Sequence, residues 1–250
     1  MFKIVTITTI LFLRLITPSS PQNYLLNFPK IVLWAWERQE KLNTIDIKNI
    51  GIAYLAKTIY LHDNNVIIRP RFQSLEIPKN TFLIAVVRIE SYILKPDKID
   101  SYKISKIIRD IIELSKTKKL KAIQIDFDAK LSERIFYRKL LFELRNKLPL
   151  DIGLSITALA SWCIYDYWIS DLPIDEAVPM LFRMGKDKDR ILLYLKKGMN
   201  FKSICDKSFG ISLDEPIQYL PSNRRVYFFN TNKWLESDIN NIKQGVKSLK

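Results

Sequence analysis

The chain has few of the residues that nucleotide-binding and metal-binding motifs require. Its 250 residues include six glycines, two cysteines and one histidine. The glycines form neither a G-x-G-x-x-G fingerprint nor a P-loop, which argues against a doubly wound nucleotide-binding fold. Cys163 and Cys205 are too few for a disulfide scaffold and lack the spacing of metal ligands, although a bridge between them is an open alternative.

The single histidine, His62, restricts two kinds of catalytic site. A Ser-His-Asp triad would have to use it, and no G-x-S-x-G elbow accompanies it. A metal site combining His62 with carboxylates would lack a His-Asp-His cluster at ligand spacing. The sequence therefore predicts no metal centre and no cofactor.

The chain also lacks an apolar run of the roughly 20 residues needed to span a bilayer. Its N-terminus has Lys3, an apolar stretch over residues 4–13, Arg14 and a breaker segment over residues 18–21. This pattern is typical of a short export signal, although no small-x-small cleavage site is present. We predict a signal peptide or N-terminal anchor over residues 1–20 and a periplasmic or other extracytoplasmic location, the alternative being an apolar tail.

The formal net charge of +14 is unaccompanied by any nucleic-acid-binding motif. The lysines are spread over expected helices within residues 103–119 and 186–202, which is typical of a solvated basic surface. Biased codon composition would also supply them. Zinc-finger spacing, an RRM signature and basic heptads are all missing, so we expect no nucleic-acid partner. An anionic glycan or a membrane surface fits the charge equally well, and the oligomeric state is not specified.

Short apolar strands alternate with helical patterns along the chain, without a linker or a repeat of fixed period. A parallel sheet with crossovers is expected from strands that are apolar on both faces. Helices are predicted from Thr44 through Leu55, over residues 104–112, and from Ser132 with Ile135, Phe136, Leu140, Leu144 and Leu148 facing inward. Strands are predicted over residues 31–36, 58–61, 82–89, 122–128, 152–159, 177–182, 209–213 and 226–229. Eight strands in 250 residues predict an α/β fold of the (βα)8, TIM-barrel-like type, forming a single domain over residues 30–250.

The fourth expected strand ends in two carboxylates. Residues 122–128 read Ala-Ile-Gln-Ile-Asp-Phe-Asp, so Asp126 and Asp128 project from one face of the strand. The carboxyl ends of barrel strands are where active sites lie. Two carboxylates this close repel each other, and one is expected to have a raised pKa.

Other polar and aromatic residues follow the remaining strands. Carboxylates supply the acid, base or nucleophile of glycoside hydrolysis, and aromatic faces stack on sugars, so the set predicts a sugar-binding cleft. Instead of a functional role, Glu90 could form a structural ion pair with Arg88 or Arg183. Trp34 and Trp36 could likewise fill the barrel core instead of contacting a sugar. The predicted substrate-binding residues are Glu37, His62, Trp162, Trp168, Arg183 and Glu215.

The chain resembles an uncharacterised bacterial family called domain of unknown function 3142. The resemblance rests on residues 124–129, Ser132 with Phe136-Tyr137, residues 155–163 and residues 175–185. It extends over most of the chain from about Val32 onward. The resemblance implies a barrel related to glycosyl hydrolases and brings no established reaction.

A more distant resemblance is to the family 18 chitinases, whose fourth strand carries D-x-x-D-x-D-x-E with the glutamate as general acid. The corresponding residues here are Ile123, Asp126, Asp128 and Lys130. The two middle aspartates are kept, whereas lysine replaces the acid. The resemblance therefore implies either that another carboxylate, such as Glu90, Glu176 or Glu215, supplies the proton, or that the protein binds glycans without cleaving them.

Three hypotheses follow for function. The first is an extracytoplasmic glycosidase-like enzyme acting on a polysaccharide, with catalytic residues Asp126, Asp128, Glu90 and Glu176. In it Asp128 is the base or nucleophile, and Glu90 or Glu176 is the acid. The second is a non-catalytic glycan-binding barrel that uses Trp162, Trp168 and Arg183. The third is a basic protein that associates with an anionic polymer or a membrane surface.

Overall fold

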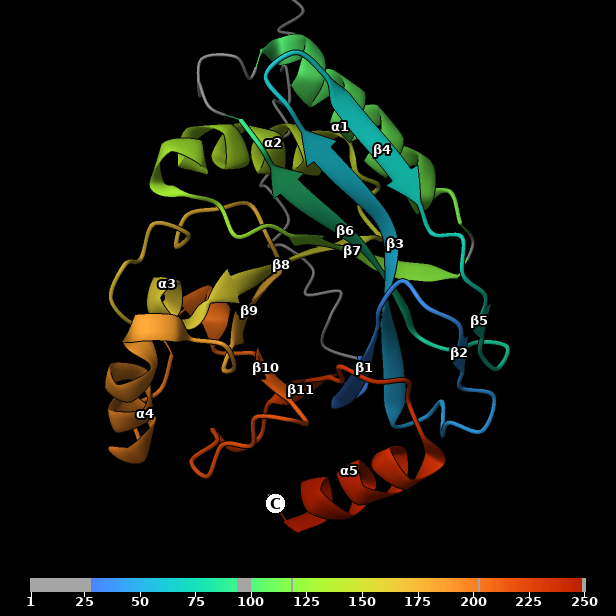
Figure 1. Cartoon of the computed structure of the whole chain (residues 1–250), viewed down its shortest axis with the longest axis vertical. Helices are drawn as coiled ribbons and strands as arrows, with labels where there is room; N and C mark the ends of the chain where they lie inside the picture. The colour runs from blue at the N-terminus through green and yellow to red at the C-terminus, as the bar shows by residue number, and fades with distance from the viewer. Residues whose placement is uncertain (1–27, 94–99, 118, 202, 249–250) are drawn as a thin grey trace, which may run out of the picture.

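Eight parallel strands close into a barrel (Figure 1). The computed structural model describes residues 28–93, 100–117, 119–201 and 203–248. The last barrel strand pairs with the first, so the sheet has no free edge within the barrel. In their order around the barrel the strands are β1 (Ile31–Ala35), β3 (Ile50–Leu61), β6 (Leu83–Ser91), β7 (Leu120–Asp126), β8 (Gly153–Leu159), β9 (Glu176–Met180), β10 (Ser208–Ser212) and β11 (Arg225–Phe229). The predicted (βα)8-like barrel is confirmed.

The helices cover the barrel unevenly. Five α-helices follow strands β6, β7, β8, β9 and β11 in the described part of the chain: α1 (Ser101–Ser115), α2 (Arg134–Lys147), α3 (Ala160–Ile164), α4 (Lys188–Lys196) and α5 (Glu236–Ser248). No helix separates β1 from β3 or β3 from β6 in these described segments. Short strands replace them: β2 (Glu40–Lys41) pairs with β5 (Leu75–Glu76), and β4 (Val66–Pro70) forms an antiparallel hairpin with β3.

The helix predicted from Thr44 to Leu55 is wrong. Residues from Ile50 onward belong to β3, which pairs with β1 on one side and β6 on the other. The apolar spacing that suggested a helix arises because both faces of this strand are buried, which hides the two-residue period. Ile135 was also placed inward wrongly: it is 84% exposed, because the buried face of α2 consists of Phe136, Tyr137, Leu140, Leu141 and Leu144.

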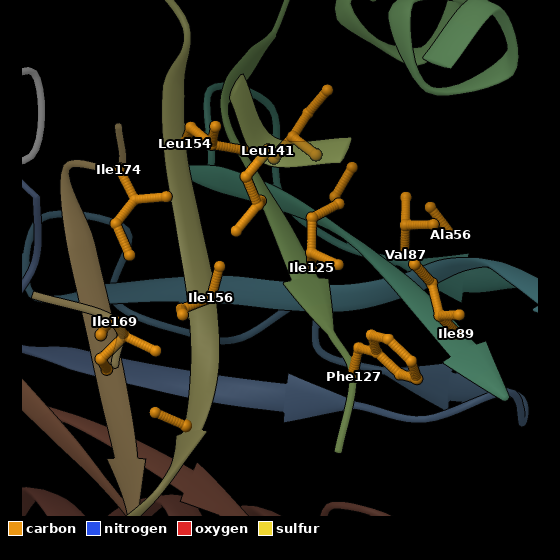
Figure 2. Close-up of a cluster of buried hydrophobic side chains, with 14 of the residues drawn as sticks. Ala56, Val87, Ile89, Ile125, Phe127, Leu141, Leu154, Ile156, Ile169 and Ile174 are labelled. Atoms are coloured by element: carbon orange, nitrogen blue, oxygen red, sulfur yellow. The ribbon is translucent and has the colours of Figure 1, made fainter. Parts of the chain in front are cut away.

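The main hydrophobic core lies between the barrel and the helices. Alternate strand residues such as Val87, Ile125 and Ile156 point outward into it, where they meet residues such as Leu141 of α2. Figure 2 shows this cluster, with Phe127 just beyond the end of β7. A second cluster fills the inside of the barrel, where Trp34 of β1 stacks on Phe229 of β11 with ring centroids 4.4 Å apart. These two packed layers make the carboxyl end of the barrel a rigid platform.

A polar network lies inside the barrel at its amino end. Glu176, the first residue of β9, is 0% exposed and forms an ion pair with Arg225 Nη1 at 2.5 Å. It also accepts a hydrogen bond from the Tyr227 hydroxyl at 2.8 Å. Burial and the Glu176 carboxylate raise the pKa of Tyr227 well above its ordinary value. The network satisfies a carboxylate that would otherwise be costly to bury.

Cys163 of α3 and Cys205 form a disulfide across 42 residues of sequence, the alternative that the sequence left open. Cys205 ends η4 (Ser203–Cys205), a short 3-10 helix before β10. The bridge therefore encloses β9 and α4 in one covalent loop.

Replacing both cysteines by alanine is expected to lower the free energy of unfolding by about 4 kcal/mol, because a loop of this length no longer restricts the unfolded chain. Urea denaturation would measure the loss. The native protein with and without dithiothreitol is the matched control, since reduction should reproduce the effect. Identical midpoints for the oxidised and reduced native protein would contradict the prediction.

The predicted export signal over residues 1–20 lies outside the described residues. Within the described segments, no helix has the length and apolarity that a membrane span requires.

Candidate functional site

Asp126 and Asp128 lie together at the carboxyl end of β7. Asp126 is the last residue of the strand and points into the barrel mouth, where it is 9% exposed. Phe127 points the other way and packs edge-on against Tyr137 of α2, with centroids 5.1 Å apart. Asp128 follows beyond the strand with an exposed side chain. Both carboxylates line the same two cavities, as the two-residue spacing predicts.

The Asp126 carboxyl group holds its proton unusually strongly. Burial raises its pKa from 3.8 to about 6. A hydrogen bond of 2.7 Å from the Thr157 hydroxyl and the guanidinium of Arg88, 3.9 Å away, oppose this shift, whereas Asp128 and Glu90 reinforce it. The pKa of Asp126 is raised as the sequence predicts, but the largest cause is burial, and repulsion from Asp128 contributes less. Such a group changes protonation close to neutral pH.

The pKa of Asp128 is also raised. Neighbouring protein atoms remove water from this carboxyl group although part of the side chain is exposed, and Arg88 acts in the opposite direction. Behind the pair, burial together with the charges of Asp126 and Asp128 raises the pKa of Tyr137 well above its ordinary value. The pair thus occupies an environment that favours neutral carboxyl groups.

Arg88 of β6 connects the aspartates to Glu90. Its Nε atom lies 3.0 Å from Glu90 Oε1, and its guanidinium lies 5.7 Å from the ring centroid of Trp36. The other Glu90 oxygen accepts a hydrogen bond from the Tyr92 hydroxyl at 3.0 Å. Both Glu90 oxygens are therefore engaged, and the structural ion pair with Arg88 is present.

Two cavities of about 270 Å³ each meet at Arg88, Asp126 and Asp128. The first, the apolar cavity, has walls from β1, β8, β9 and β11; its lining residues include Trp36, Leu159, Met180, Phe182 and Phe229. The second, the polar cavity, opens toward β6 and the start of α2; its lining residues include Glu90, Tyr92, Lys130 and Glu133. The carboxylate pair therefore stands between an apolar hollow and a polar one.

Arg183 and Glu215 lie together at the far rim of the apolar cavity. Arg183 lines that cavity and has a positive φ of 50°. Its backbone N–H donates to Glu215 at 2.8 Å, and Lys188 lies 3.1 Å from the same carboxylate. The backbone hydrogen bond lowers the pKa of Glu215 more than any other cause. Glu215 thus shapes the loop that presents Arg183.

Glu37 and His62 do not join the aspartates. Glu37 accepts hydrogen bonds from the backbone N–H groups of Phe72 at 2.8 Å and Gln73 at 3.4 Å, which ties the segment between β4 and β5 to the end of β1. His62 stacks on Tyr92 with ring centroids 5.2 Å apart, in the β3–β4 hairpin.

The expectation that Trp162 and Trp168 contact a sugar is not supported by their positions. Trp162 is 2% exposed, and Trp168 packs against it edge-on at 4.9 Å, with the guanidinium of Arg134 5.0 Å from the Trp168 ring. Trp162 of α3 belongs to the core between barrel and helices, and Trp168, which follows α3 and is partly buried, packs against that core. Trp34 fills the barrel as the alternative interpretation held, whereas Trp36 lines the apolar cavity.

Glu176 is placed at the wrong end of the barrel for the predicted acid role. It begins β9 instead of ending it, and its carboxylate is fully buried against Arg225 and Tyr227. Pro179 does not end the strand, which continues to Met180. Glu176 pairs in register with Ser155 of β8, which pairs with Gln124, two residues before Asp126. Its carboxylate thus lies inside the barrel below the aspartate pair and lines neither of the two cavities.

Two further residues of the polar cavity were not identified from the sequence. Tyr92 follows β6 directly, where alternation from Arg88 and Glu90 could have placed it at the mouth. Glu133 ends η2 (Leu131–Glu133) and is 2% exposed; one of its oxygens accepts a hydrogen bond of 2.8 Å from the backbone N–H of Lys130. A glutamate three residues after the start of a helical turn is the sequence signal for such a bond. The hydrogen bond between Glu133 and Lys130 fixes the segment that follows Asp128.

The described residues contain no group of three or more His, Cys, Asp or Glu side chains arranged to hold a metal ion.

Residues 79–178 match the model of a family described as "Domain of unknown function (DUF3142)". The matched region contains Glu90, Asp126 and Asp128. No curated protein sequence matches the chain. Among solved structures, the chain is similar to the spore cortex-lytic enzyme SleL of Bacillus cereus, with 17% identity and a TM-score of 0.46 over 72% of this chain and 50% of that chain. The chain thus spans about half the length of SleL.

Proposed function

We propose that this protein is a glycoside hydrolase that cleaves a polysaccharide at the Asp126–Asp128 pair. The observation that carries the proposal is the pair itself: two carboxyl groups with raised pKa values at the carboxyl end of a closed parallel barrel, between two cavities. Glycoside hydrolysis uses one protonated and one ionised carboxyl group, and environments that shift pKa values supply this difference.

The two aspartates take different roles in the proposal. Asp128 is exposed to the cavities and serves as base or nucleophile. Asp126 is the proton donor, because its pKa of about 6 keeps it largely protonated in mildly acidic solution. Glu90 suits this role less well than the sequence suggested, since Arg88 and Tyr92 engage both its oxygens. Arg88 then orients Glu90 and Asp126 at once.

The apolar cavity supports a carbohydrate ligand. Trp36, Phe182 and Phe229 place aromatic surface beside the carboxylates. Sugar rings present apolar C–H faces that pack on aromatic side chains, while their hydroxyls need polar partners such as Asp128 and Arg183. This mixture of an apolar wall with a few polar groups is typical of small ligand sites.

The Asp128→Asn variant is expected to lose at least about 100-fold in turnover, because asparagine cannot act as base or nucleophile. Reducing-end release from a panel of bacterial and plant polysaccharides, including chitin and peptidoglycan, measures the loss. Asp151→Asn is the matched control, since Asp151 is exposed in the turn before β8, at the opposite end of the barrel. Equal turnover in the native protein and Asp128→Asn would contradict the proposal.

A second candidate function is glycan binding without cleavage. It is favoured by Lys130, which lines the polar cavity at the position where the resembling chitinases carry their acid. The same panel separates the two functions. No release from any polymer, together with retention of the protein on one of them, would favour the binding function.

We further propose that the protein is exported. The N-terminal pattern motivates this location, and the Cys163–Cys205 disulfide supports it, because such bridges persist chiefly in oxidising compartments.

A further inference from the structure

Three aromatic rings form an aromatic strip on β3 and the segment after β6, consisting of Tyr60, His62 and Tyr92. Tyr60 pairs in register with Glu90, and the Tyr92 N–H bonds to the Leu61 carbonyl at 2.8 Å, so the rings stand on neighbouring strands. The His62 and Tyr92 rings lie 5.2 Å apart and nearly parallel, at 11°. The Tyr60 ring lies 6.4 Å from Tyr92 at 26°. The strip is an ordered stack.

The aromatic strip is open to solvent. Tyr92 is 54% exposed, and the side chains of Tyr60 and His62 are half-buried. Beyond His62, a shallow hollow of about 350 Å³ is lined by residues of the β3–β4 hairpin. Tyr92 thus leaves aromatic surface exposed to solvent beside this hollow.

The aromatic strip is continuous with the polar cavity. Tyr92 lines that cavity together with Asp126 and Asp128. Its hydroxyl donates to Glu90, which Arg88 holds beside Asp126. A ligand chain that reaches the carboxylate pair through the polar cavity would therefore pass over the Tyr92 ring.

Charges of both signs surround the strip and the polar cavity. The basic residues are Arg88, Lys130 and Arg69, whose guanidinium lies 5.5 Å from the Tyr60 ring. The acidic residues are Asp63, Glu90, Asp126, Asp128 and Glu133. Because basic residues are not in excess, the surface offers no net attraction for an anionic sugar and suits an uncharged one with an apolar face.

We propose that the aromatic strip is a subsite for an uncharged pyranose unit of the polysaccharide, next to the unit held at the Asp126–Asp128 pair. The exposed part of the Tyr92 ring packs against the sugar face, and His62, stacked on Tyr92, supports that ring from the other side. The inference rests on the proposed function for the kind of ligand, a polysaccharide, and not for the reaction, because binding at the aromatic strip requires no cleavage.

Binding is measured in the Asp128→Asn background, by retention on the polysaccharide and by calorimetry with its oligosaccharides. Adding Tyr92→Ala is expected to weaken binding of long oligosaccharides about 5- to 10-fold, the size of one aromatic stacking contact. Tyr92→Phe keeps the ring and should bind within about twofold. His62→Ala removes the ring that supports Tyr92 and should weaken binding by a smaller factor than Tyr92→Ala. The added Phe142→Ala substitution, which removes an exposed aromatic ring from α2, is the matched control and should change nothing.

The outcomes separate the subsite from the hydrolase. Loss of binding in Tyr92→Ala and His62→Ala, unchanged between about 50 and 500 mM salt, supports the subsite even if the native protein releases no reducing ends. Unchanged binding in both variants overturns it. Binding that collapses as the salt concentration rises also overturns it, because this would indicate attraction between charges rather than ring stacking.

Discussion

The Asp126→Asn variant is expected to be more stable than the native protein at neutral pH, by up to about 3 kcal/mol, while its turnover falls at least about 100-fold. The carboxyl group has a pKa of 3.8 when solvated and about 6 in the fold. Between these values the folded protein keeps a proton that the unfolded chain has released. Stability therefore decreases as the pH rises from about 4 through 6, and an uncharged asparagine avoids this loss.

The asparagine side chain fits the surroundings of Asp126. Its carbonyl oxygen can still accept the hydrogen bond from the Thr157 hydroxyl, and only the ion pair with Arg88, at 3.9 Å, is removed. Urea unfolding of both proteins from about pH 4 to 8 measures the effect. The two stability curves should nearly coincide at about pH 4 and separate through about pH 6. A separation that is the same at every pH, or one that Asp151→Asn reproduces, would contradict the explanation.

The Glu176→Gln variant is expected to lose about 3–5 kcal/mol of stability, because it removes the carboxylate that forms a buried ion pair with the Arg225 guanidinium inside the barrel. Arg225 is 6% exposed and cannot move its charge into water without disrupting the barrel floor. Thermal or urea unfolding measures the loss. Turnover per folded molecule should stay within about twofold of the native value at temperatures where the variant is folded.

A double variant distinguishes a structural ion pair from a catalytic acid. Glu176→Met combined with Arg225→Met replaces the pair by apolar groups, and such replacements are often neutral for stability. It should recover most of the stability lost in Glu176→Gln. If Glu176 donated the catalytic proton, both variants would instead be inactive while folded, which is the outcome that the buried position of Glu176 argues against.

The sequence predicted the barrel well because its strands are short, apolar and separated by clear helical patterns. The exception was β3, a long strand buried on both faces, which lacks the alternation that distinguishes a strand from a helix. The absence of helices after β1 and β3 could not be anticipated once residues 44–55 had been read as helical. The hairpin of β4 takes their place there.

The candidate site was predictable where it depends on strand periodicity. Asp126 ends β7 and Asp128 lies two residues farther along the chain, so the sequence spacing predicted that both face the same cavities. Glu176 was misplaced because an apolar run does not reveal at which residue a strand begins. Trp162 was misplaced because the short helix after β8 has no periodic pattern from which its inward side could be read. Trp36 looked like core, and only the three-dimensional arrangement shows that it lines a cavity.

The Cys163–Cys205 bridge affects how the apolar cavity withstands proteolysis. The loop that it closes carries Met180, Phe182 and Arg183, which form one wall of the apolar cavity, and also the exposed turn before α4. A protease that cuts this turn would produce two fragments that stay joined through the bridge, so that α4, β10, β11 and α5 remain attached to the part of the barrel that carries the wall. In an oxidising medium rich in proteases, the disulfide-bonded barrel would therefore stay assembled after such a cut. The same cut would separate the two fragments of a protein whose disulfide had been reduced.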